Sequence, residues 1–183
     1  MASLEAEISR LLREYRGRTG KLLTLGTVES ATGGRIADRL TNVPGISDYF
    51  KGSVVAYGDE VKTALLGVSQ ATIANYGAVS EQTALEMAQR GCKLLRVDIC
   101  MSDTGIAGPA GSSPGKPVGL FYLGLVAGHA NSSEKHVFCG NREENKRDAA
   151  EAALIMLKQY LLTYVNEAQT VVEARHYDSV QQG

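Results

Sequence analysis

Residues 21–40, KLLTLGTVESATGGRIADRL, contain the stretch from which the rest of the fold can be worked out. The first eight residues are β-prone, and the apolar side chains around Ile36 to Leu40 follow helical spacing. Between the two lies a small polar turn, Glu29 to Gly34. The stretch therefore predicts a strand, a tight turn and a helix in immediate succession.

The same alternation of strands and helices continues along the chain. Between Ser3 and Gly17, apolar residues at helical spacing predict an amphipathic helix that precedes the first strand. The other predicted strands cover residues 52–58, 97–104, 119–128 and 135–140. The other predicted helices cover residues 60–66, 70–76, 81–95 and 142–164. Because the last two strands are joined by a short polar turn at Asn131 to Ser133, they can form an antiparallel hairpin. We expect an α/β sandwich with a mixed central sheet of about five or more strands flanked by helices.

The length of the chain predicts one domain. A chain of 183 residues is near the upper end of a single domain and can bury a core without disulfides. We place this domain at residues 1–165 and a more polar C-terminal tail at residues 166–183. Two alternatives stay open for the tail, disorder or order gained by packing on a neighbouring subunit.

The composition argues against several classes of protein. The 19 basic and 20 acidic side chains give a formal net charge of -1, so there is no electrostatic case for nucleic-acid binding. The three cysteines form no Cys-x-x-Cys pair, which argues against a disulfide framework or a zinc site and fits a reducing cytoplasm. No apolar run approaches the roughly 20 residues of a membrane span, and the N-terminus lacks the pattern of a secretory signal. We expect a soluble cytoplasmic protein without a metal or an organic cofactor.

The polar turn of the first unit is the first candidate for chemistry. A serine at a strand-to-helix junction is exposed, and the free N–H groups of the following helix start can hold an oxyanion or a phosphate. Ser30 is the candidate nucleophile, with N–H donors at Thr32, Gly33 and Gly34. Taken alone the pattern is weak, because capping a helix is the commoner role of a serine or threonine at such a position, and Ser30 or Thr32 can serve as a simple cap.

A second candidate follows the next strand, where Tyr57 and Lys62 occur in the segment VVAYGDEVK. A serine needs a base, and the three histidines show no recognisable Ser-His-Asp arrangement. A lysine can replace histidine when burial or a neighbouring cation lowers its pKa. The competing interpretations are a solvated helix charge for Lys62 and a half-buried strand aromatic for Tyr57.

The third and fourth candidates are a glycine-rich loop and a basic helix start. Thr104 ends a predicted strand, and Gly105 and Gly108 begin a loop whose backbone can approach a ligand closely. The loop matches neither a phosphate-binding Walker loop nor a dinucleotide fingerprint. Arg142 and Arg147 place cations near a helix start, where the helix dipole does not favour them. Anion binding explains these cations, and a solvated charged face explains them equally well.

Taken together, these segments resemble the CinA C-terminal family, which includes stand-alone nicotinamide-nucleotide amidases (PncC type). Four stretches carry the resemblance in the same order and spacing: ESATGGRIADRLTNVPGISDYFKGSVVAYGDEVKTALLGVS, YGAVSEQTALEMA, TGIAGPAGSSPGKPVG and GNREENKR. The resemblance covers about residues 5–165. The chain departs from the family pattern at Gly58-Asp59-Glu60, in the loop at Ala110 to Ser113, and at Asn145, where an aliphatic residue is usual.

The resemblance implies a function and assigns roles to the candidate residues. It implies hydrolysis of the carboxamide of nicotinamide mononucleotide by a serine and lysine pair, Ser30 and Lys62, with Tyr57 as an accessory group. It also matches Thr104 and Arg142 to family positions and implies subunit association, most simply a homodimer. Two alternatives stay open, a non-catalytic nucleotide-binding or assembly module of the same fold, and an amidase for another small carboxamide.

Overall fold

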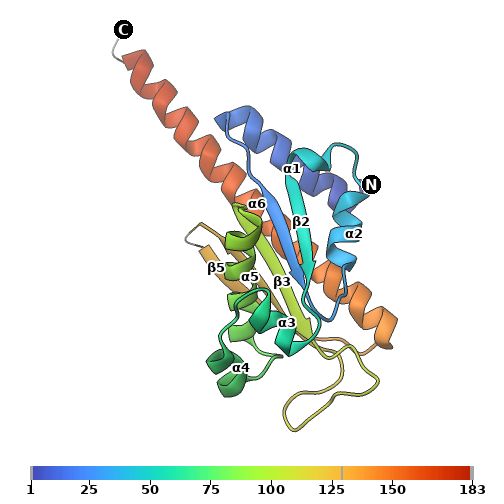
Figure 1. Ribbon diagram of the computed structural model, residues 1–183. Helices are drawn as coiled ribbons and strands as arrows, with labels where there is room; N and C mark the ends of the chain where they lie inside the picture. The colour runs from blue at the N-terminus through green and yellow to red at the C-terminus, as the bar shows by residue number, and fades with distance from the viewer. Residues whose placement is uncertain (1, 129, 182–183) are drawn as a thin grey trace.

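A mixed five-stranded sheet forms the centre of the computed structural model, which describes the backbone of residues 2–128 and 130–181 and the side chains of residues 2–128 and 130–166. Its strand order is β2-β1-β3-β4-β5 (Figure 1). β1, β2 and β3 run parallel, whereas β4 and β5 form an antiparallel hairpin beside β3. The strands are β1 (Leu25–Glu29), β2 (Phe50–Val55), β3 (Ile99–Gly105), β4 (Leu120–Ala127) and β5 (Ala130–Val137). The predicted α/β sandwich with a mixed sheet is confirmed.

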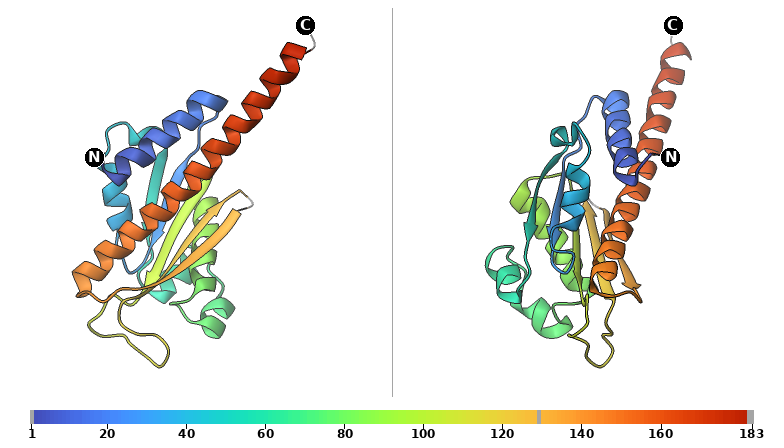
Figure 2. Two further views of the ribbon diagram at one scale, coloured as in Figure 1. Left: turned by 180° about the vertical axis from the view of Figure 1, so that it is seen from behind. Right: turned by 90° about the vertical axis from the view of Figure 1, so that its right-hand side faces the viewer.

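Helices cover both faces of the sheet, as the edge-on view in Figure 2 shows. One face is covered by α1 (Leu4–Thr19), α2 (Arg35–Thr41) and α6 (Arg142–Gln181), and the 3-10 helix η1 (Ile46–Asp48) packs beside them. The other face is covered by α3 (Asp59–Ala64), α4 (Gln70–Tyr76) and α5 (Glu81–Leu95). Because β1 is central and covered on both sides, all five of its residues are buried.

Local sequence signals explain where α1 begins and ends. The hydroxyl of Ser3 accepts a hydrogen bond from the N–H of Ala6, which caps the helix. Gly20 ends the helix with a φ of 71°, a left-handed conformation that glycine adopts without strain. The apolar stripe predicted from the sequence is buried against the sheet and α6, with Ile8 and Leu12 fully covered.

The hairpin of β4 and β5 differs from the prediction in the position of its turn. Asn131 to Ser133 were expected to form the turn, but they belong to β5 and pair with Val126 to Gly124. β4 ends at Ala127 and β5 begins at Ala130, so the connection is tighter than predicted, and Gly128 takes the left-handed φ of 58°. The polarity of these β5 residues reflects their exposure on an edge strand rather than a turn.

The C-terminal helix α6 is longer than predicted. It continues without a break past residue 165, where the domain was expected to end, and reaches Gln181 beyond the body of the protein (Figures 1 and 2). Neither glycine nor proline occurs in its 40 residues, so nothing in the sequence interrupts the helix there. The side chains of the predicted tail from residue 167 onward lie outside the described residues, as does that of His129. Among the described helices, none combines the length and apolar character that crossing a membrane requires.

Candidate active site

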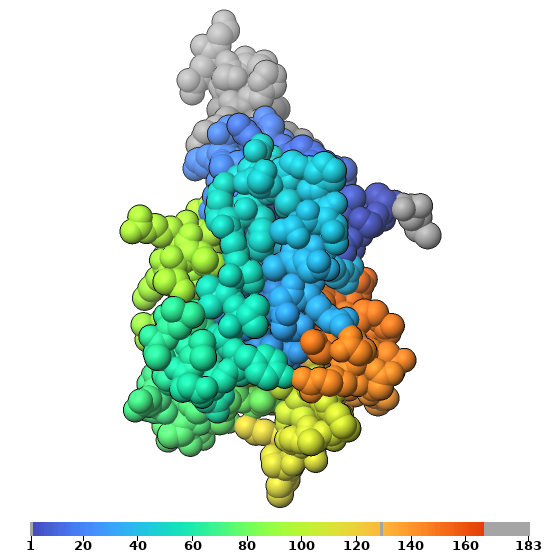
Figure 3. Space-filling model, turned by 45° about the vertical axis from the view of Figure 1, so that its right-hand side comes forward, coloured from blue at the N-terminus to red at the C-terminus, as the bar shows by residue number. Residues whose placement is uncertain are grey.

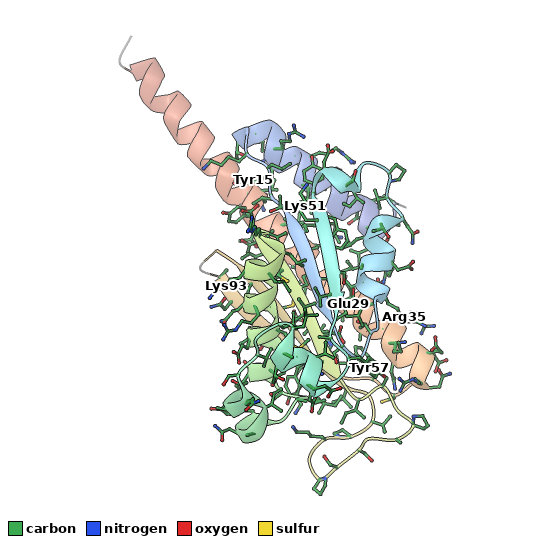
Figure 4. All side chains as sticks on the ribbon, in the orientation of Figure 1. Tyr15, Glu29, Arg35, Lys51, Tyr57 and Lys93 are labelled. Atoms are coloured by element: carbon green, nitrogen blue, oxygen red, sulfur yellow. The ribbon has the colours of Figure 1, made fainter. Side chains whose placement is uncertain are left out.

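Three neighbouring parallel strands bring the predicted residues together at the end of the sheet where their carboxyl termini lie. Ser30 follows β1, Tyr57 follows β2, and Thr104 lies at the end of β3. Figure 4 shows Glu29 and Tyr57 at this end of the sheet and Lys51 toward the opposite end. A cavity of about 340 Å³ opens here, lined by Ser30, Lys62, Tyr57, Thr104 and Arg142 together with the loop at residues 105–111. Ligand sites of α/β sheets commonly occur at this end.

The Ser30 turn is a tight connection from β1 to α2. The N–H of Gly33 donates to the carbonyl of Ser30 at 3.1 Å, which closes the turn. Gly33 and Gly34 then take left-handed φ values of 68° and 97°, so the double glycine is required by the backbone path. Ser30 is 6% exposed and faces the cavity, and its neighbour Ala31 lines the same cavity.

A buried acidic residue on β3, Asp103, supports this turn from beneath. Its carboxyl group accepts hydrogen bonds from the N–H groups of Ser30 (3.1 Å) and Thr32 (3.0 Å). Burial, with a smaller contribution from the charge of Glu29, raises the pKa of Asp103 to about 6. No role was predicted for Asp103 from the sequence, although an acidic residue inside a strand predicted to be buried indicates a polar network.

Glu29, the last residue of β1, is the second buried carboxylate. It accepts hydrogen bonds from the N–H groups of Ile36 (3.0 Å) and Ala37 (2.8 Å), which belong to the first turn of α2. It therefore caps α2 from within the protein, in place of a side chain at the helix start itself. The turn that carries Ser30 is thus held at both ends by carboxylates.

Lys62 lies on α3 and is 2% exposed. Its ammonium group donates to the backbone carbonyl of Tyr57 at 3.1 Å and to the carboxylate of Asp59 at 3.3 Å. An ammonium group has three donors, so one is left for a group in the cavity. The burial predicted for a catalytic lysine is present, and the solvated alternative is wrong.

Arg142, at the start of α6, joins two walls of the cavity. Its guanidinium donates to the phenol oxygen of Tyr57 at 2.6 Å and to the carbonyl of Gly108 at 2.7 Å. Tyr57 is 56% exposed, so this link lies at the rim of the cavity rather than at its floor. The space-filling view shows the loop that contains Gly108 beside the start of α6 (Figure 3).

Thr104 and the glycine loop form a further wall. The hydroxyl of Thr104 donates to the carbonyl of Ala78 at 2.7 Å, which leaves its oxygen free to accept a hydrogen bond from a ligand. Gly108 takes a left-handed φ of 89°, which a glycine adopts without strain. Gly105 is a packing glycine, because a Cβ there would stand 2.5 Å from the ring of Phe121.

Four of the predicted binding residues do not line this cavity. Thr32 is fully buried, and its N–H is engaged by Asp103. Gly33, Gly34 and Arg147 line a separate hollow of about 330 Å³ between α2 and α6. Arg147 is paired there with its neighbour Asp148. The structure therefore separates these residues from Lys62 and Arg142.

Asn145, near the start of α6, links the loop to this helix. Its side chain is fully buried, donates to the carbonyl of Ala107 at 3.0 Å and accepts from the N–H of Gly140 at 2.9 Å. An aliphatic residue could make neither bond. The amide therefore fixes the loop and the start of α6 relative to each other.

A larger hollow of about 560 Å³ lies at the opposite end of the sheet, between α5 and α6. Cys92, Lys93 and Tyr160 are among the residues that line it. None of the predicted site residues does so. Within the described residues there is also no group of three or more histidines, cysteines or carboxylates that could hold a metal ion.

Comparison with known proteins agrees with this fold. The family model of the CinA C-terminal domain matches residues 2–161. The chain belongs to the CinA C-terminal domain family. The CinA-like protein of Sulfurihydrogenibium sp. (strain YO3AOP1) is 41% identical over 160 residues, which cover 87% of this chain and 38% of that relative. A putative competence-damage inducible protein of Halothermothrix orenii is 45% identical over 161 residues, which cover 87% of this chain and 37% of that relative. The chain thus spans less than two fifths of the length of these CinA relatives.

Solved structures of the CinA family share the fold over most of the chain. The competence damage-inducible protein A of Klebsiella pneumoniae superimposes with a TM-score of 0.80 at 31% identity, covering 87% of this chain and 95% of that one. The competence/damage inducible protein CihA of Agrobacterium tumefaciens gives a TM-score of 0.74 at 33% identity, covering 91% and 99%.

Proposed function

We propose that this CinA-family domain hydrolyses the carboxamide of nicotinamide mononucleotide to nicotinate mononucleotide and ammonia. The observation that carries the proposal is the presence of Ser30 and buried Lys62 in the wall of one cavity. A serine hydroxyl requires a base to act as a nucleophile, and a buried lysine can supply it.

The proposed reaction uses only groups of the chain and water. Neutral Lys62 accepts the proton of the Ser30 hydroxyl, and the oxygen attacks the carboxamide carbon. The tetrahedral intermediate collapses when the amide nitrogen receives a proton from Lys62, and ammonia leaves. Water then attacks the nicotinoyl ester with Lys62 again as base, which releases nicotinate mononucleotide and restores the Ser30 hydroxyl.

The N–H of Ala31 is the best-placed oxyanion donor in the turn. The N–H groups of Ser30 and Thr32 are bound to Asp103, and that of Gly33 closes the turn. Ala31 lines the cavity, and its N–H donates to no acceptor in the described part of the chain. Preorganised donors of this kind stabilise the charge that develops on the carbonyl oxygen.

The rim of the cavity offers a cation for an anionic ligand. The guanidinium of Arg142 is among the groups that line the cavity. The volume of about 340 Å³ is at the small end of the range for small-molecule sites. Arg142 is the proposed partner of the substrate phosphate, since a guanidinium binds phosphate oxygens through two N–H groups.

An ammonia-release assay with a panel of pyridine compounds tests the proposal. The panel contains nicotinamide mononucleotide, its riboside, free nicotinamide and an unrelated small carboxamide. We expect release from the mononucleotide, and none from Ser30→Ala protein with an unchanged circular dichroism spectrum. Binding of the mononucleotide without turnover would support the non-catalytic alternative, and turnover of another carboxamide alone would support a different amidase.

A further inference from the structure

The hydroxyl of Thr32 lies between two fully buried carboxyl groups. Its oxygen is 2.7 Å from Oε2 of Glu29 and 2.5 Å from Oδ2 of Asp103. All three residues have no solvent exposure. The two carboxyl groups come from neighbouring strands at the same level. Val28 of β1 pairs with Ser102 of β3, and Glu29 and Asp103 are the next residues along these strands.

The number of protons in this network decides whether both contacts are hydrogen bonds. A threonine hydroxyl has one hydrogen, and an ionised carboxylate can only accept. With both carboxyl groups ionised, one of the two contacts would place oxygen against oxygen without a hydrogen between them. Both contacts become hydrogen bonds when one carboxyl group carries a proton.

The other contacts favour that proton on Asp103, because more donors stabilise the charge of Glu29. Each carboxyl group accepts two backbone N–H groups, one on each oxygen. Glu29 also accepts the hydroxyl of Thr27 at 3.2 Å. Protonated Oδ2 of Asp103 can donate to Thr32 and still accept the N–H of Ser30 with its remaining lone pair. The hydrogen bonds then run in one direction, from Asp103 to Thr32 to Glu29.

We propose that Asp103 is a positioning residue for the Ser30 turn and that the Glu29–Thr32–Asp103 network holds the turn with one bound proton. Asp103 does not line the cavity, so it acts through the backbone of Ser30 and Thr32 and not on a ligand. The importance of Asp103 for turnover rests on the proposed function. The presence of the bound proton does not depend on that function.

The surroundings of Asp103 favour uptake of the proton. Burial is the largest cause of the rise of its pKa to about 6, and the charge of Glu29 on β1 adds to it. On β4 the residue paired with Asp103 is Leu123, which is apolar. The charged groups of α2 and α6 on this side surround the neighbouring hollow. Three arginines there are held in ion pairs: Arg35 with Glu143, Arg39 with Glu5 and Glu151, and Arg147 with Asp148. Asp38 also lines the hollow, and Lys146 lies beside Gly33. Below about pH 6 the network is complete, and above it one contact of Thr32 loses its hydrogen.

Infrared difference spectroscopy of the folded protein tests the bound proton directly. Between about pH 5 and about pH 8, wild type should lose a protonated-carboxyl band and gain a carboxylate band with a midpoint near pH 6. Asp103→Asn should lack this transition. Asp103→Thr, which suits a strand better than Asn, should lack it too and serves if Asp103→Asn does not fold. The matched control Asp48→Asn removes an exposed aspartate on η1 and should retain it. Absence of the transition in wild type, or its persistence in a folded Asp103 variant, would overturn the proposal.

Amide resonances report whether the proton acts on the turn. In wild type and in Thr32→Ser, which keeps the hydroxyl, the N–H resonances of Ser30 and Thr32 should titrate with the same midpoint as the infrared band. In Asp103→Thr these titrations should vanish. Resonances that stay constant with pH in wild type would show that the carboxyl group does not position the turn. Neither measurement uses a substrate, so failure of the proposed amidase activity leaves both results unaffected.

Discussion

The guanidinium of Arg142 donates a 2.6 Å hydrogen bond to the phenol oxygen of Tyr57, although the two residues are 85 positions apart in the chain. The bond ties the start of α6 to the segment that follows β2, across the rim of the cavity. A ligand phosphate at the rim would meet a guanidinium that is already oriented. This link motivates the first prediction.

Arg142→Ala should lower kcat/KM for the mononucleotide by about ten- to a hundredfold, because a charge-assisted hydrogen bond contributes about 1.5–3 kcal/mol. The riboside lacks the phosphate, so its kcat/KM should change much less. Arg147→Ala is the matched control, since Arg147 lies in the separate hollow and should leave both values unchanged. Equal losses for nucleotide and riboside in Arg142→Ala would remove Arg142 from phosphate binding.

Ser30→Ala and Lys62→Met should each abolish nearly all ammonia release while the thermal unfolding transition remains cooperative. Methionine replaces the buried stem of Lys62 with a side chain of similar volume, so no large cavity forms. The double variant should be scarcely slower than either single variant, because a base without its nucleophile has no role. Multiplicative losses in kcat would contradict a pair that acts as one unit.

Asp103→Thr should change how the free energy of unfolding depends on pH. In wild type the pKa of Asp103 is about 6 in the folded state against 3.8 in the unfolded chain. The folded state therefore binds the proton more tightly than the unfolded chain does. The contribution of this proton to the free energy of unfolding is complete below about pH 3.8 and is lost as the pH rises through 6. The loss is about 3 kcal/mol, from roughly two pKa units at 1.36 kcal/mol each. Urea unfolding at a series of pH values should show this decline in wild type and a shallower one in Asp103→Thr.

The chain should form a homodimer. The helices that cover the sheet expose large apolar side chains, including Tyr76, Leu94 and Ile155. Burying such side chains between copies removes apolar surface from water. Sedimentation at micromolar concentration checks this, and a single species at the chain mass of 19.5 kDa would contradict it.

Much of the fold was predictable from the sequence because local signals were strong. The apolar stripe of α1 and the β-prone strand before Ser30 each specify their element locally. The hairpin turn was misplaced because polar residues on an exposed edge strand resemble a turn in composition. The extent of α6 was missed because polarity was taken as the end of the helix, although no residue there breaks one.

The candidate site was predictable in its residue types but only partly in its geometry. The junction of strand and helix indicated Ser30, and the resemblance indicated Lys62, yet burial of that lysine depends on how α3 packs. The engagement of the Thr32 N–H by Asp103 depends on strand register between β1 and β3, which no local pattern specifies. The separation of Arg147 from Arg142 was available from helix geometry, because residues five positions apart lie about 140° apart around a helix.

The polar edge strand β5 has a consequence for the behaviour of the protein at high concentration. An edge strand presents unpaired main-chain groups to which a strand of another molecule can add. β5 carries Asn131, Glu134 and Lys135 along this edge, and most of the strand is exposed. A strand added there would have to desolvate these polar and charged side chains, which opposes growth into fibres. Asn131, which the sequence pattern assigned to a turn, therefore acts with Glu134 and Lys135 to protect this edge of the sheet from aggregation.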